Sequence, residues 1–234
     1  MTVGIYPSVA AKRRARIVTI GNEKGGSGKS MTAMHLSIGL LRSGRSVATL
    51  DLDLPQRRLT RYMENRRAYA AAHGLTLPMP EHETLAAVAP THSGQSEVAG
   101  EDRLEGVVER LLDGHDMVVI DTPGTDNVLS RTAHSLADVL VTPLNDSFID
   151  LDVLARVDGA RMKILGPSHY SEMIWEQKMR RAQRDGGSID WIVMRNQGLT
   201  MMDLREASGA QKLTIFHLAA RQEVRSLIEA LGLP

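Results

Sequence analysis

Short apolar runs rich in β-branched residues recur along the chain, and segments with helical spacing separate them. Each run spans four or five residues and shows no alternation with polar residues. The first four end at or next to Gly, Asp or Pro, and the last ends at Arg195-Asn196. This pattern is typical of strands that are buried on both faces of a sheet. The predicted strands are residues 16–20, 47–51, 117–121, 139–143 and 191–194.

Between these runs, apolar residues recur every three or four positions, which is the spacing of one helix face. Helices are predicted over residues 31–43, 59–72, 102–112, 151–165, 171–184 and 222–231. Residues 73–100 have few periodic apolar positions and are predicted to form a long surface loop. Alternating strands and helices predict an α/β fold, a mostly parallel open sheet with helices on both faces. In such sheets ligands bind at the carboxyl ends of the strands.

The composition fits a single domain with a short extension. The 234 residues are 42% apolar, enough for a core, and residues 16–234 are predicted to form one domain. Residues 1–15 carry a basic cluster without an apolar stretch, and we expect a disordered extension there. The absence of cysteine excludes a disulfide scaffold and thiolate-bound clusters, and fits a cytoplasmic protein. No apolar run is long enough for a membrane span.

Formal net charge is zero, but the charges are unevenly distributed. Residues 1–67 hold thirteen Lys and Arg against four Asp and Glu. A basic half of this kind can face the phosphates of a nucleotide or of nucleic acid. Two basic clusters in the chain could contact DNA or could be solvated helix faces. The clusters are Arg57, Arg58 and Arg61, and Lys178, Arg180, Arg181 and Arg184.

A glycine-rich loop between the first strand and the first helix carries the chemistry. The segment Gly25-Gly26-Ser27-Gly28-Lys29-Ser30 stands where a P-loop must stand. Its backbone N–H groups and the helix N-terminus would cradle phosphate oxygens. Lys29 would reach the β- and γ-phosphates, and the Ser30 hydroxyl would bind Mg²⁺. The loop departs from the strict pattern at Glu23, where a glycine is usual, and Lys24 supplies a second lysine.

Three carboxylates end strands beside this loop. Asp121 follows an apolar run and is a natural Mg²⁺ partner through water, while Asp51 and Asp53 end the neighbouring strand. Alternation places Asp51 and Asp53 on one side of that strand. One of them could support Mg²⁺ and the other could orient the attacking water, although Asp53 could also cap the following turn.

Lys24 is a better candidate than any arginine for neutralising charge on the transferred phosphoryl group. No arginine stands out in the sequence as a cation supplied in cis to the phosphates. Lys24 lies too early in the loop to reach its own γ-phosphate easily. If two subunits faced each other, each Lys24 could cross to the partner's nucleotide, which would couple hydrolysis to dimerisation.

These residues resemble a known family. The segment Lys24–Ser30 resembles the deviant Walker A loop of the ParA/MinD superfamily of ATPases. Taken with the motifs that surround it, the chain from about residue 16 to residue 196 resembles the MipZ family, ATPases that position the division plane. The further matching segments are residues 21–23, 50–54, 64–67, 121–124, 143–148, 170–175 and 190–196.

The resemblance implies an ATPase switch that uses ATP and Mg²⁺. Such proteins are monomers without ATP and form a nucleotide-sandwich dimer with it. The implied partners are a second copy, ParB, FtsZ, whose polymerisation is inhibited, and double-stranded DNA bound without sequence preference. The implied location is the cytoplasm, at the nucleoid and the poles. In residue terms, Lys24 would cross the dimer, Asp53 would position the water, and Asn196 would lie near the adenine.

The chain departs from the family after Asn196. Family members continue into a long basic helix and another strand, whereas here residues 198–204 resemble the segment that follows those elements. We therefore predict that one helix and one strand are missing near the C-terminus. Their loss would expose a sheet edge and weaken the binding of nucleotide and DNA, since fewer cations would contact phosphate.

Other functions remain open at this point. The chain could be a non-cycling P-loop protein that acts through protein contacts alone, or a ParA that partitions chromosomes or plasmids. A small-molecule kinase would need an acceptor site and a lid, and the sequence shows neither. A metal-carrying relative is disfavoured because its thiolates are absent.

Overall fold

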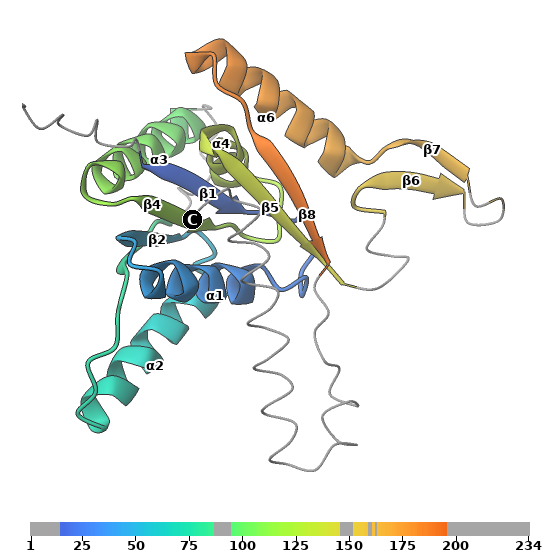
Figure 1. Ribbon diagram of the computed structural model, residues 1–234. Helices are drawn as coiled ribbons and strands as arrows, with labels where there is room; N and C mark the ends of the chain where they lie inside the picture. The colour runs from blue at the N-terminus through green and yellow to red at the C-terminus, as the bar shows by residue number, and fades with distance from the viewer. Residues whose placement is uncertain (1–14, 87–94, 146–151, 159–160, 162, 196–234) are drawn as a thin grey trace, which may run out of the picture.

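Six parallel strands form the centre of the molecule, in the order β3-β2-β4-β1-β5-β8 (Figure 1). The computed structural model describes residues 15–86, 95–145, 152–158, 161 and 163–195. All five pairings in this sheet are parallel, so the strands present their carboxyl ends at one edge. The strands are β1 (Arg16–Ile20), β2 (Val47–Asp51), β3 (Glu81–Thr84), β4 (Met117–Asp121), β5 (Val139–Leu144) and β8 (Asp190–Arg195).

The five strands predicted from apolar runs are confirmed, and the sixth was missed. The predicted loop over residues 73–100 is wrong in part, because it contains β3 and the start of helix α3 (Gln95–Gly114). The sequence Glu-His-Glu-Thr of β3 has no apolar residue. It pairs only with β2 in the described sheet and keeps its outer edge open. An edge strand needs no buried apolar face, so periodicity gave no signal.

Helices cover both faces of the sheet, as predicted. Helices α1 (Lys29–Arg42) and α2 (Arg58–Ala72) pack on one face, where Leu36, Leu40 and Met63 meet the side chains of β1, β2, β4 and β5. Helices α3, α4 (Val128–Leu136) and α6 (His169–Asp185) lie on the opposite face (Figure 1). The α/β fold class is therefore confirmed. Helix α4 was missed because its nine residues include four Ser, Thr or His side chains that are buried in hydrogen bonds.

The helix predicted over residues 151–165 is wrong. Strands β6 (Ala155–Asp158) and β7 (Lys163–Pro167) form an antiparallel hairpin there. Ile164 and Leu165 are 75% and 67% exposed, so their apolar side chains do not form the buried stripe of a helix. Gly159 interrupts the segment, and glycine is unfavourable inside a helix.

Several predictions fall on residues outside the described ranges. They concern the extension, the helix over 222–231, Asn196, and the missing helix and strand, and they stay predictions. Among the described helices, none combines the length and apolar character needed to cross a membrane.

Candidate functional site

The glycine-rich loop has the backbone of a phosphate-binding loop. It leaves the carboxyl end of β1 and leads into α1, whose first residue is Lys29. Gly26 and Gly28 have φ angles of 77° and 92°, in the left-handed region that glycine enters without a Cβ penalty. The N-terminus of α1 therefore points its N–H groups and its positive dipole end into the loop, as an anion requires.

Asn22 and Lys29 hold the loop in this shape. Asn22 is buried, donates from Nδ2 to the Pro143 carbonyl at 2.8 Å, and accepts from the Lys24 N–H at 2.8 Å. The Lys29 ammonium donates to the Lys24 carbonyl at 3.0 Å. Burial lowers the pKa of Lys29, while Asp121 and Asp53 act in the opposite direction. The lysine head thus lies inside the loop, and no carboxylate of the described residues is in hydrogen-bond contact with it.

Asp51 and Asp121 lie side by side at the carboxyl ends of β2 and β4. The register pairs the two residues, and both are fully buried. Neither oxygen of the Asp121 carboxylate has a hydrogen-bond partner in the described part of the chain, although the Ser30 hydroxyl is close enough to lower its pKa. Burial outweighs this effect and raises the pKa of Asp121 to about 7. A buried carboxylate beside Ser30 and Lys29 with both oxygens unpaired fits a cation such as Mg²⁺.

Asp51 is bound within the protein instead. Its Oδ2 accepts from the Thr60 N–H at 3.0 Å and from the Thr60 hydroxyl at 2.6 Å, and its Oδ1 accepts from the Asp53 N–H at 3.0 Å. Asp51 therefore ties the end of β2 to the first turn of α2 and shapes the loop that carries Asp53. The pKa of Asp53 is raised, first by burial and then by the neighbouring Asp51.

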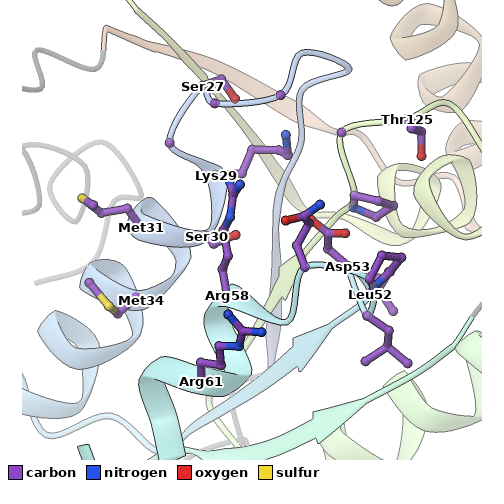
Figure 2. Close-up of a pocket in the computed structure, with 18 of the residues that line it drawn as sticks. Ser27, Lys29, Ser30, Met31, Met34, Leu52, Asp53, Arg58, Arg61 and Thr125 are labelled. Carbon is purple, nitrogen blue, oxygen red and sulfur yellow. The ribbon is translucent and has the colours of Figure 1, made fainter. Parts of the chain in front are cut away.

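A cavity of about 1220 Å³ opens between the glycine-rich loop, the loop after β2 and helix α2. Figure 2 shows Ser27, Lys29 and Ser30 on one wall and Asp53 across from them. Arg58 and Arg61 of α2 complete the wall on the side away from the loop (Figure 2). The structure thus brings together Gly25–Ser30 and Asp53 in one cavity. Asp121 and Asp51 are fully buried and do not line it, but their charges act on the lining residues Lys29 and Asp53.

Gly124 lies directly against the glycine-rich loop. A Cβ at this position would lie 3.3 Å from Lys29 Nζ and 3.4 Å from the Gly25 N–H nitrogen. The segment after β4 therefore packs directly on the glycine-rich loop. Thr60, Arg58 and Gly124 were not predicted from the sequence as residues of this site. Only Gly124 carried a local signal, since it follows Asp121 in a motif of the resembled family.

The buried side chain of His134 lies against Gly21, where the glycine-rich loop begins. A Cβ at Gly21 would lie 2.3 Å from His134 Nε2. The same nitrogen is 3.2 Å from the Tyr170 hydroxyl, which is 3.2 Å from Thr142 Oγ1. Burial lowers the pKa of His134 to about 4 and raises that of Tyr170, so both groups are neutral at physiological pH. This network fixes the end of β1, and it requires glycine at position 21.

The two basic clusters differ in their roles. In the α6 cluster, Arg181 is 2% exposed, and it binds Asp138 at 2.8 Å and Asp185 at 2.9 Å. Arg180 approaches Glu101 at 3.4 Å. Both arginines therefore serve contacts inside the fold. In the α2 cluster, Arg57 pairs with Glu64, whereas Arg58 and Arg61 line the cavity.

Comparison with known proteins agrees with this geometry. The family model described as ATPase MipZ matches residues 16–197 and 196–234. The chain belongs to the MipZ family of ATPases. The match covers nearly all of the chain and comes in two pieces that meet at residues 196–197, where we predict that a helix and a strand are missing.

Individual relatives match about three fifths of this MipZ-family chain. It is 29% identical over 153 residues to the chromosome-partitioning ATPase Soj of Thermus thermophilus, covering 62% of this chain and 60% of Soj. It is 28% identical over 163 residues to the septum site-determining protein MinD of Helicobacter pylori, covering 63% and 60%. Against the chromosome partitioning protein ParA of Caulobacter vibrioides the identity is 30%, covering 61% and 60%. The chain thus spans about 60% of the length of these curated relatives.

Solved structures share the fold of this MipZ-family member. A plasmid partition protein from Borrelia burgdorferi superposes with a TM-score of 0.59 at 12% identity, covering 93% of this chain and all of the other. Cobyrinic acid a,c-diamide synthase from Mycobacterium smegmatis, solved with ADP and magnesium, superposes with a TM-score of 0.50 at 17% identity, covering 93% and 96%. At these identities the likeness concerns the fold alone.

Proposed function

We propose that this chain is a Mg·ATP-dependent dimerisation switch that couples chromosome segregation to placement of the division site. The observation that carries the proposal is the Asp121 carboxylate, buried and unpaired beside Ser30 and Lys29, two residues that line an open cavity. Desolvating such a group is costly unless a cation or proton offsets it. Bound Mg²⁺ and phosphates would supply the missing partners.

Each binding residue has a role that follows from its surroundings. Backbone N–H groups of Gly25–Ser30 would hold phosphate oxygens, and the Lys29 ammonium would exchange the Lys24 carbonyl for phosphate. Ser30 and Asp121 would hold Mg²⁺, partly through water, with Asp51 beside them. Mg²⁺ would neutralise charge on the phosphates.

Hydrolysis would depend on Asp53 and Lys24. Asp53 lines the cavity on a loop that Asp51 and Thr60 hold in place, which suits a residue that positions the attacking water. Lys24 would cross to the nucleotide of a second subunit. This part of the proposal makes turnover depend on dimerisation, and so on protein concentration. Asn196 is proposed to lie near the adenine.

The proposed partners are a second copy of the chain, ParB, FtsZ and non-specific double-stranded DNA. Relatives named for partitioning and for septum placement support the link between segregation and division. DNA binding is proposed to be weak, because Arg180 and Arg181 already serve contacts inside the fold. The protein would act in the cytoplasm, at the nucleoid and the poles.

Two alternatives use the same site. In the first, the chain binds nucleotide without cycling and acts only through protein contacts. In the second, it is a ParA that partitions a chromosome or plasmid, as the names of several relatives suggest. Both alternatives predict nucleotide binding, so the tests must measure turnover and the response of FtsZ.

Light scattering behind a sizing column tests the proposal directly. We expect the wild type and Asp53→Ala to be monomers without nucleotide. With Mg·ATP, the variant should accumulate as a dimer because it binds ATP but hydrolyses it slowly. A monomer at saturating ATP would refute the switch. Dimerisation without any turnover by the wild type would favour the non-cycling alternative, and dimerisation and turnover without an effect on FtsZ assembly would favour the partitioning one.

A further inference from the structure

Arg58 lines the wall of the proposed nucleotide cavity, and the spacing of residues in the sequence does not predict this position. It is the first residue of α2, and it lines the cavity together with Lys29, Ser30 and Asp53. Figure 2 shows it between Ser30 and Arg61, extending from α2 toward the glycine-rich loop. The preceding residue, Arg57, has a φ of 48°, and this left-handed turn sets the direction in which α2 begins.

Cationic side chains outnumber carboxylates on the wall of the cavity around Arg58. Lys29, Arg58 and Arg61 line the cavity against a single lining carboxylate, that of Asp53. Within the described residues, no ion pair or hydrogen bond involves the Arg58 guanidinium, whereas the adjacent Arg57 pairs with Glu64 at 3.2 Å.

The pKa shifts of Lys29 and Asp53 also reflect the positive charge of Arg58. The positive charge of Arg58 contributes to lowering the pKa of Lys29 and opposes the rise in that of Asp53, so the guanidinium lies within electrostatic range of both. An anion entering the cavity would therefore meet cations from two directions, from the P-loop and from α2.

We propose that Arg58 binds the terminal phosphate of the nucleotide in cis, from the side of the cavity opposite the glycine-rich loop. The inference rests on the proposed nucleotide site and adds a residue to it. The loop and Lys29 hold the phosphates from one side. A planar guanidinium with five donors then suits the outward oxygens of the last phosphate, which the loop does not cover. ADP lacks this phosphate, so Arg58 distinguishes ATP from ADP.

Calorimetric titration of the full chain with Mg·AMP-PNP and with Mg·ADP tests the proposal. We expect Arg58→Ala to weaken AMP-PNP by about 10-fold or more, since a hydrogen bond to a charged group is lost, while ADP changes by less than about 2-fold. Arg58→Lys keeps the positive charge but loses the planar guanidinium with its paired donors. Its affinity for AMP-PNP should lie between those of the wild type and Arg58→Ala. The matched control is Arg57→Ala, which removes an equal charge one residue away outside the cavity wall and should leave both affinities unchanged.

Each other outcome has a distinct meaning. Equal weakening of both nucleotides by Arg58→Ala would show a structural role of Arg58 and would overturn the inference, as would unchanged binding of AMP-PNP. If the wild type bound neither nucleotide, the proposed function itself would fail, together with the inference. If Arg58→Ala did not fold, the selective loss of AMP-PNP binding would be measured on Arg58→Lys. An equal change in the affinities for AMP-PNP and ADP in that variant would overturn the inference.

Discussion

Replacing Asp121 with Asn should stabilise the nucleotide-free protein, and the gain should grow with pH. The fold raises the pKa of Asp121 from 3.8 to about 7, so the folded state holds this proton more tightly than the unfolded chain does. The resulting loss of stability is absent below the unfolded pKa, grows as pH rises, and is complete above the folded pKa. At about 1.4 kcal/mol per pKa unit, the full effect is about 4 kcal/mol, of which about 3 kcal/mol develops between about pH 5 and pH 8.

The assay is urea unfolding of the wild type and Asp121→Asn with a metal chelator present, at about pH 5 and about pH 8. The difference between the two proteins cancels the titration of other groups, His134 included. Asp116→Asn is a control without pH dependence, because hydrogen bonds from Ser46 lower the pKa of Asp116 below 3.8 and the carboxylate is ionised at both pH values, so its loss should destabilise the protein equally at both. An Asp121→Asn gain that is the same at both pH values would refute the idea that this carboxylate is unpaired in the apo protein.

Three further predictions concern residues that support the site. Gly21→Ala should lower the free energy of unfolding by about 1–3 kcal/mol through the clash with His134, measured by urea unfolding; no loss would contradict the contact. Thr60→Val should cost about 1–3 kcal/mol in the same assay, because buried Asp51 loses a hydroxyl donor, and Thr60→Ser should restore it. His134→Gln should reduce the decrease in the free energy of unfolding at acid pH, since the lowered pKa of His134 makes folding less favourable as pH falls from 6.5 to about 4. An unchanged decrease at acid pH would contradict a buried neutral His134.

Local sequence was enough to predict five strands, of which β1, β2, β4 and β5 are lined with buried side chains, and the loop that follows the first of them. Strands such as β1 and β4 are buried on both faces, so each carries its own apolar run, and the glycines of the loop adopt φ angles that only their own residue type favours. The sequence placed Asp51 and Asp121 at the carboxyl ends of two parallel strands, and the pairing of β2 with β4 sets the two residues side by side.

Elements without a buried apolar face of their own were not predictable in this way. Strand β3 is polar, and it exists because β2 offers an unpaired edge. The hairpin of β6 and β7 exposes apolar residues that a spacing argument assigned to a helix. In both cases the backbone hydrogen bonds come from a neighbouring strand, and the sequence of a single segment does not encode its neighbour.

By itself the sequence determined the parallel α/β core, the glycine-rich loop and the presence of Asp51 and Asp121 at strand ends, with Asp53 just beyond the end of β2, because each depends on residues close together in the chain. Only the tertiary structure decided that Asp51 is bound by Thr60 while Asp121 is left unpaired, and that Arg58 lines the cavity beside the glycine-rich loop. Those roles depend on how α2 packs against the sheet. The free energy of a charged group is set by the partners and the burial that packing gives it, and these arise only when distant segments meet.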